Sequence, residues 1–331
     1  MGEIDIRAHE LLRDTEEFSR LFNMALFGGQ EVVRSELLQD ANTVVALSDD
    51  AKGYGGKGRK KKCMKGALSI RDLLRKVQIM KDGCATYMLL GVENQAAIDY
   101  GMVPRLLNYN VRNHILEGLD LGHKGKEDNA RPFTSRMGPS DRLTPVVSVV
   151  VYYGDKPWDG ATELSELFCE LPKEIEEALK PYLPSYKIKV VSAQCTDSEL
   201  DMLGPGLRSV LYYVRYAHDA SGLQEMLEKH TELRTPPPLA ARLISCLMGI
   251  EFNFEEKKEN IDMWTVVEQL KEIGRAEGRA EGRAEGRAEG MTEVICSMYQ
   301  NGMKIREISE STNIPQSRLR RMVAKKKDQK V

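Results

Sequence analysis

The sequence predicts an α/β protein in which a small mixed sheet is flanked by helices and followed by a helical carboxy-terminal half. The segment 144–154 is rich in β-branched and aromatic residues, which is typical of a strand buried on both faces. Apolar residues recur at helical spacing over 8–27 and 96–116, on either side of the other strand-like segments. After residue 197 the patterns are helical, so the sheet belongs to the first part of the chain.

The first elements are predicted to be helices, and strands follow them. The helical spacing of 8–27 stops at the paired glycines 28–29, and a second, short helix is expected over 30–39. Three strands come next, and a Lys-Asp-Gly turn at 81–83 predicts that the last two form a hairpin. The predicted strands cover 41–48, 66–77, whose spacing also fits a helix, and 85–93.

The later elements extend the sheet once and then form the helical half. The helix over 96–116 contains Pro104, which should bend or restart it because proline lacks the N–H that a helix interior needs. A strand over 188–193 is expected at the edge of the sheet, and the prolines 236–238 mark a rigid break among the helices that follow. These helices are predicted over 197–218, 221–231, 238–250 and 256–273.

Composition favours a cytoplasmic protein without a membrane partner. The 331 residues carry a formal net charge of −2. The six cysteines are scattered without the spacing of a metal site, which is typical of reduced thiols in a cytoplasmic protein. No run of about eighteen apolar residues is present, so no membrane-spanning helix is expected.

Basic residues gather in two stretches, 51–65 and 317–331, although the overall charge is slightly negative. The first stretch combines four glycines with seven basic residues. It is interpreted either as a solvated loop between strands or as a loop that follows a nucleic-acid backbone through phosphate contacts. The DNA-binding candidates in it are Lys57, Arg59, Lys60, Lys61 and Lys62.

Two acidic residues stand beside strand-like segments. Glu93 follows the apolar run 88–92, so it lies where that strand leaves the core, and Asp72 follows another short apolar run. Burying a lone carboxylate there is costly. Either Glu93 is paired, or it coordinates a divalent ion such as Mg²⁺ together with Asp72, because hard cations take oxygen ligands.

Further motifs accompany these acids in a fixed order. They are Arg71-Asp72, Leu90-Gly91-Val92-Glu93-Asn94-Gln95, Ile98-Asp99-Tyr100-Gly101-Met102, Pro104-Arg105, Asn108-Tyr109, Pro145-Val146-Val147, Tyr152-Tyr153-Gly154 and Lys156-Pro157-Trp158. This series resembles the PD-(D/E)XK nuclease family transposases, which are relatives of the Rpn recombination-promoting nucleases. The resemblance covers roughly residues 10–225.

The resemblance implies a restriction-endonuclease-like core that cleaves DNA. In such a core Asp72 and Glu93 lie at adjacent strand positions and hold Mg²⁺, or another divalent metal such as Mn²⁺, aided by the main-chain carbonyl of Asn94. A metal held in this way activates water and neutralises charge on the phosphate, and no small-molecule cofactor is needed. The implied partner is DNA, and the implied setting is recombination or transposition.

Gln95 departs from the broad superfamily, which has lysine at this third motif position. An amide supplies no positive charge, but it can orient the attacking water by donating and accepting hydrogen bonds. Gln95 is therefore kept as a catalytic candidate, and Lys76 or Lys81 is a hypothesis for the missing cation.

Other residues near the acidic pair leave alternatives open. Arg105 could contact a phosphate or pair with a nearby carboxylate. The superfamily often adds an acidic ligand from its first helices, and Glu31 and Glu36 are the candidates here. The sequence does not choose between them.

Four exact Arg-Ala-Glu-Gly units occupy residues 275–290. Their period of four places like charges at i and i+4 of a helix, which is unfavourable, and each glycine costs roughly 1 kcal/mol relative to alanine. A semi-flexible helical spacer is expected, with self-association as the alternative.

The tail after the repeat has three short helical patterns. The spacing of 305–319 resembles a helix-turn-helix whose first helix ends at Asn313 and whose second begins near Pro315. An amphipathic helical hairpin, serving as an oligomerisation end of a homodimer, explains the same pattern. In the first interpretation the second helix presents Gln316, Ser317, Arg318, Arg320 and Arg321 to DNA.

The expected organisation is a nuclease-like core over 1–195, a helical extension over 196–273, a spacer over 274–290 and a basic tail over 291–331. The expected function is that of a metal-dependent DNA endonuclease associated with recombination or transposition. The alternative is a catalytically inactive nuclease fold that serves as a DNA-binding or protein-interaction module.

Overall fold

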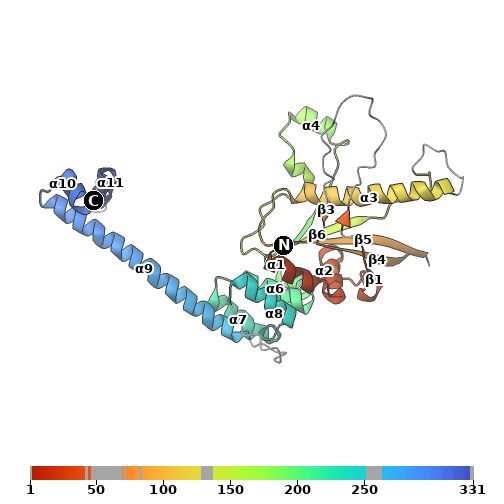
Figure 1. Cartoon of the computed structure of the whole chain (residues 1–331), viewed down its shortest axis with the longest axis horizontal. Helices are drawn as coiled ribbons and strands as arrows, with labels where there is room; N and C mark the ends of the chain where they lie inside the picture. Colours follow the sequence, from red (N-terminus) through yellow and green to blue (C-terminus); the bar gives the residue numbers. More distant parts are fainter. Residues whose placement is uncertain are drawn as a thin grey trace, which may run out of the picture. The chain divides into compact units, whose positions relative to one another are not determined.

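The computed structural model describes residues 2–41, 44–45, 69–70, 72–81, 84–127, 137–250 and 263–328. The chain divides into two compact units, Met1–Trp264 and Thr265–Val331, and each is considered by itself (Figure 1).

A mixed five-stranded sheet organises the first unit (Figure 1). Its spatial order is β1-β4-β5-β6-β7, with antiparallel pairs from β1 to β5 and parallel pairs from β5 to β7. This confirms the predicted mixed sheet flanked by helices. The strands are β1 (Leu38–Asp40), β4 (Leu73–Lys81), β5 (Cys84–Gln95), β6 (Val146–Tyr152) and β7 (Lys189–Ser192).

Helix α3 (Met102–Glu127) connects the two parallel strands β5 and β6. Parallel neighbours need such a crossover, and its first turns bury Met102 and Leu106 against Val150 of β6. Pro104 is the third residue of α3, where its missing N–H has no intrahelical partner to lose. The helix predicted over 96–116 therefore begins only at Met102, two residues before this proline, and it runs on to Glu127.

The buried strand β6 confirms the sheet core predicted from 144–154. Four consecutive residues, Val149–Tyr152, are each at most 3% exposed, so both faces of this strand are covered. The edge strand predicted over 188–193 is also confirmed as β7, next to β6. A short helix, α4 (Lys173–Leu179), and a 3-10 turn, Leu164–Leu167, lie between β6 and β7 and were not predicted.

The helix predicted over 8–27 is two helices, α1 (Glu3–Leu12) and α2 (Thr15–Phe27). Asp14 interrupts the pattern because its carboxylate accepts the N–H groups of Glu16 and Glu17 and so begins a new helix. The predicted end is confirmed, since Gly28 caps α2 in the left-handed conformation with φ 59°.

The short helix predicted over 30–39 is wrong. Only Ser35–Leu37 form a 3-10 turn, and β1 follows it at once. The Asn23 side chain accepts the N–H groups of Val32 and Val33 and donates to the carbonyl of Val33. These bonds take backbone groups that a helix would use, and they hold the segment against α2.

The strands predicted over 41–48 and 66–77 are shorter or shifted in the described residues. Val44–Val45 (β2) and Ser69–Ile70 (β3) pair with each other in a separate two-stranded sheet, and β4 begins at Leu73. The hairpin of β4 and β5 is confirmed by its antiparallel register, which ends with Lys81 opposite Cys84.

A helical layer completes the first unit, and α6 and α8 contact α1. Glu17 of α2 fixes this layer because its buried carboxylate accepts the N–H groups of Gly206 and Leu207 at 2.6 and 2.9 Å, at the start of α6. A Cβ on Gly206 would lie 2.8 Å from this carboxylate, so glycine is needed there. The helices are α5 (Asp197–Asp201), α6 (Pro205–Arg215), α7 (Ala220–Lys229) and α8 (Pro238–Met248).

The carboxy-terminal helices confirm the predicted helical half of the chain. Helix α9 (Trp264–Gln300) begins later than the helix predicted over 256–273 and continues through all four repeat units. Two shorter helices follow, α10 (Ile305–Thr312) and α11 (Gln316–Asp328).

Candidate active site

The predicted acidic pair lies at one end of the hairpin formed by β4 and β5. The strand register places Leu73 opposite Val92, and the same register puts Asp72, one residue before β4, opposite Glu93. Leu73 and Val92 are buried, and each acidic residue is next to one of them in sequence. Asp72 therefore lies just before β4 and Glu93 lies within β5, at the same end of the hairpin.

Glu93 is the more buried carboxylate, with 2% of the residue exposed. Its Oε2 atom accepts a hydrogen bond from Nη2 of Arg105 at 2.8 Å, and Nη1 of Arg105 binds Oδ2 of Asp99 at 2.8 Å. Burial alone would lower the pKa of Arg105, but the hydrogen bond and charge of Glu93 raise it overall. Of the two roles considered for Arg105, carboxylate pairing is the one present here, and it supplies a permanent cation at the site.

Asp72 lies in a different electrostatic environment. Its Oδ2 atom accepts the main-chain N–H of Asn94 at 2.8 Å. Burial raises the pKa of the Asp72 carboxyl, and the Asn94 hydrogen bond opposes that shift only in part. Asp5 adds to the rise, whereas Arg105 and His9 act against it. The Asp72 carboxyl is thus held closer to protonation than an ordinary aspartate.

Asn94 connects this strand end to the next strand. Its side-chain Oδ1 accepts a hydrogen bond from the Tyr153 hydroxyl at 2.9 Å, just beyond β6. Burial strongly raises the pKa of Tyr153, followed by the charges of Asp72 and Glu17, so the phenol keeps its proton and donates it. Asn94 is a predicted ligand through its carbonyl, and in this structure its N–H and side chain hold Asp72 and Tyr153 in place.

Gln95 is the last residue of β5. Side chains alternate along a strand, so Gln95 shares a sheet face with Glu93. Its carbonyl accepts the N–H of Tyr153 at 2.8 Å, which fixes the backbone at the strand end. Gln95 is partly exposed.

The lysines considered as replacements for the missing motif cation lie elsewhere. Nζ of Lys76 is 3.9 Å from the centroid of the Tyr87 ring, which is a cation–π contact. Lys81 is the last residue of β4, at the opposite end of that strand from Asp72. Among the described residues, Arg105 is a cation that contacts Glu93 directly.

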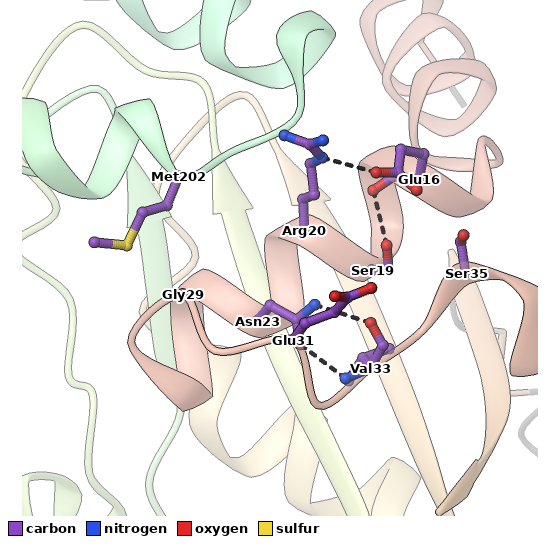
Figure 2. A pocket seen from close by; sticks show the side chains of 9 residues that line it. All are labelled: Glu16, Ser19, Arg20, Asn23, Gly29, Glu31, Val33, Ser35 and Met202. Carbon is purple, nitrogen blue, oxygen red and sulfur yellow. Dashed lines mark hydrogen bonds and ion pairs between the residues drawn. The ribbon is translucent and has the colours of Figure 1, made fainter.

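The first-helix candidates Glu31 and Glu36 both follow the end of α2. Glu31 lines a pocket of about 250 Å³ beside α2 (Figure 2). Glu36 belongs to the 3-10 turn. Arg20 in this pocket is already paired with Glu16 at 2.9 Å. The residues that line the pocket are Glu16, Ser19, Arg20, Asn23, Gly29, Glu31, Val33, Ser35 and Met202.

Sequence reasoning missed the contribution of α1. Asp5 and His9 stand one turn apart on this helix, and both act on Asp72. The Nδ1 atom of His9 is buried without a hydrogen-bond partner among the described residues. The i, i+4 spacing of Asp5 and His9 was a usable signal, but the first helix was expected to begin only at residue 8.

The predicted DNA contacts fall in three places. Arg105 belongs to the acidic cluster, and the arginines of α11 belong to the second unit. The loop candidates Lys57, Arg59, Lys60, Lys61 and Lys62 lie outside the described residues.

The donor atoms of the site are suited to a hard cation. Asp72 and Glu93 are oxygen donors on adjacent strand ends, and Mg²⁺ commonly binds through one or two carboxylates while it keeps several waters. Within the described ranges no group of three or more His, Cys, Asp or Glu side chains is arranged to hold a metal. In those ranges, too, no helix is long and apolar enough to cross a membrane.

The fold and this site define a class: a mixed α/β protein whose central hairpin ends in two acidic residues beside an arginine. A family model described as "Putative transposase, YhgA-like" matches residues 67–236, which is more than half of the chain and includes both acids. The chain belongs to this family, which is the Rpn and PD-(D/E)XK type of transposase, and the resemblance drawn from the motifs is confirmed. No curated protein and no solved structure matches the chain.

Proposed function

We propose that this chain is a DNA endonuclease of restriction-endonuclease type that depends on a divalent metal, Mg²⁺ or Mn²⁺. The observation that carries the proposal is the register of β4 and β5, which brings Asp72 opposite Glu93 with Arg105 beside them. Membership of the transposase family indicates a function related to transposition, and hydrolysis of DNA phosphodiesters is the chemistry that serves it.

The proposed metal ligands are Asp72, Glu93 and the main-chain carbonyl of Asn94. The chemistry that a divalent ion supplies in such a site is the activation of water and the neutralisation of phosphate charge. Because Glu93 is bound to Arg105, loading the site requires that the carboxylate share its oxygens or release this guanidinium. A released Arg105 is then available to a phosphate oxygen. In this proposal Arg105 pairs with Glu93 before the metal binds and contacts the phosphate afterwards.

The other residues of the site position these groups. The N–H of Asn94 orients the Asp72 carboxylate, and Tyr153 holds the Asn94 side chain. Gln95 is proposed to orient the attacking water, because an amide both donates and accepts hydrogen bonds. Asp72 has to be ionised to act as a ligand, so its raised pKa predicts that activity declines at a higher pH than an ordinary aspartate would allow.

One observation favours the rival, a nuclease fold without activity that binds DNA or a protein. The ion pair with Arg105 already gives the buried Oε2 atom of Glu93 a cationic partner, as expected of a structural salt bridge. The two functions differ in whether divalent ions bind where this pair lies.

Cleavage of supercoiled plasmid by the full chain tests the proposal. The parent, Asp72→Asn and Glu93→Gln are compared with Mg²⁺, with Mn²⁺ and with EDTA. We expect metal-dependent nicking by the parent and a loss of about 1000-fold in each variant, since several kcal/mol of charge stabilisation is removed and each 1.4 kcal/mol is a factor of ten.

Glu117→Gln is the matched control, because Glu117 is also a hydrogen-bonded carboxylate of the first unit but lies on α3 against Thr144. It should cleave as the parent does. Manganese binding, followed by electron paramagnetic resonance, supplies a readout besides cleavage. Intact plasmid and no bound manganese with folded parent protein would establish the rival.

A further inference from the structure

The last three helical segments of the chain form a small module with its own core. Ile295 of α9, Ile308 of α10 and Leu319 of α11 are at most 1% exposed and pack together. Asn313 ends α10 in the left-handed conformation with φ 57°, and the Ser309 hydroxyl donates to the Ile314 carbonyl at 2.8 Å. The turn between α10 and α11 is therefore fixed, as the helix-turn-helix interpretation requires.

Helix α11 has a distinct inner and outer face. At 100° per residue, Ser317 and Arg321 lie about 160° from the buried Leu319, on opposite sides of the outermost line of the helix. Arg318 and Arg320 each lie about 100° from Leu319, one on either side of the helix. All four of these polar residues are exposed. The outer surface of α11 is thus polar and basic, and its apolar residues are used inside the module.

The charges of this module are separated between its two short helices. On α10, Arg306 is paired with Glu310 at 3.1 Å, and Glu307 accepts the N–H of Lys304 at the helix start. On α11, no carboxylate among the described residues pairs with Arg318, Arg320 or Arg321. The positive charge of α11 is therefore available to an external partner.

We infer that this module binds duplex DNA by placing α11 in the major groove, which adds a DNA-reading surface to the proposed nuclease. Arg321, close to the outermost line, contacts a base edge, and a guanine is the preferred partner of a bidentate arginine. Arg318 and Arg320 contact the phosphates on the two sides of the groove. Ser317 faces the same groove near the start of the helix, where recognition helices usually read bases.

The outer face of α11 distinguishes this partner from the alternatives. In a two-fold contact between copies through this face, like charges would meet, because each copy presents the same arginines. A membrane-surface helix needs exposed apolar residues, whereas the large ones of α11 are turned inward. Duplex RNA has a major groove too narrow and deep for a helix to read.

The test measures DNA binding by the full chain without metal. Asp72→Asn protein in EDTA is titrated against a labelled duplex of random sequence at several salt concentrations, so the result does not depend on cleavage. Because each lost phosphate contact lowers the salt slope by about one, Arg318→Ala with Arg320→Ala should reduce it by about two and weaken binding at least tenfold.

The matched control is Arg283→Ala with Arg287→Ala, which removes the same charge from exposed arginines of the repeat. Its binding should stay within about twofold of the parent. In a selection from random duplexes, Arg321→Ala should lose preference at one base position while its salt slope is kept. Circular dichroism and light scattering establish that each variant is folded and has the parental mass.

Equal losses in the two double variants would overturn the inference, because the effect would then be one of net charge. Equal capture of duplex RNA and DNA would overturn the major-groove contact. Unchanged binding together with a change in mass would assign α11 to self-association instead. Each of these results leaves the nuclease proposal standing, since cleavage is measured separately.

Discussion

The arginine at the acidic end of the hairpin is paired with carboxylates, whereas the arginines of α11 are exposed to solvent. Arg105 contacts two carboxylates at 2.8 Å each, and one of them, Glu93, is almost fully buried. Arg318 and Arg320 are exposed, and no described carboxylate pairs with them. The same residue type is therefore part of the folded structure in one place and is available to a ligand in the other. The difference predicts which substitutions change stability and which change binding.

The largest effect should come from Arg105→Ala, which leaves the Glu93 carboxylate buried without its cation. We expect a loss of about 3–5 kcal/mol in the free energy of unfolding, because breaking a buried ion pair from one side is strongly destabilising. Urea unfolding of the full chain measures it. Arg318→Ala with Arg320→Ala should change the same quantity by no more than about 0.5 kcal/mol.

Arg20→Ala controls for the loss of any salt bridge, since Arg20 pairs with Glu16 on the surface of α2. Exposed pairs of this kind contribute at most about 1 kcal/mol. If Arg105→Ala were no worse than Arg20→Ala, the acidic pair would not depend on this arginine, and the contrast with α11 would disappear.

Leu319→Ala tests whether the basic face of α11 depends on the core beneath it. Truncating a buried leucine costs about 2–5 kcal/mol, which is enough to open a module as small as this one. Hydrogen exchange of the α10 and α11 amides should become faster, while the β5 and β6 amides stay protected. Val294→Ala, next to the core but 54% exposed, should leave the exchange of α10 and α11 unchanged.

Sequence patterns predicted correctly the elements whose structure depends on a run of apolar residues or on a single local residue preference. Strand β6 has β-branched valines at five of its seven positions, and α2 ends at Gly28 because glycine adopts the left-handed conformation readily. The failures came from side chains that bind the backbone. Asp14 divides a helix that its apolar spacing presents as continuous, and Asn23 prevents a helix that composition allows.

Some residues of the candidate site could be predicted from local motifs, and others could not. The two acids and Arg105 belong to short motifs, so their positions next to strands could be predicted from the chain. Asp5 and His9 lie more than sixty residues before Asp72 in sequence and come close to it only through the packing of α1. A local sequence pattern does not show which distant residues pack together. The only signal in the sequence was the i, i+4 spacing of Asp5 and His9, which places them on one helix face.

Tyr153→Phe tests whether the hydrogen bond from Tyr153 to Asn94 stabilises the end of the hairpin, and its expected effect is smaller. The variant keeps the ring but removes the hydroxyl that binds Asn94, so a buried amide loses its partner. A cost of about 1–2 kcal/mol is expected in urea unfolding. Tyr182→Phe is the control, because Tyr182 is 83% exposed and should be neutral. Equal stability of the two variants would mean that Asn94 does not need this bond.

The smallest expected effect has the opposite sign. Burial raises the pKa of Asp72 above its usual 3.8, so its ionised form destabilises the folded state. This cost is fully present above the raised pKa and disappears as the pH falls below the ordinary value, where folded and unfolded carboxyls are both protonated.

Asp72→Asn keeps an acceptor for the Asn94 N–H but carries no charge. It should therefore be more stable than the parent at neutral pH, by less than Tyr153→Phe loses, and the advantage should shrink towards pH 4 in urea unfolding. Asp155→Asn is the opposite control, because slight burial is outweighed by the hydrogen bond from His218, which keeps the pKa of Asp155 low. An Asp72→Asn variant that is both more stable and unable to cleave DNA would identify a carboxylate kept charged for chemistry at the expense of the fold. A loss of stability at neutral pH would instead make Asp72 a structural partner of Asn94, much as Arg105 is of Glu93.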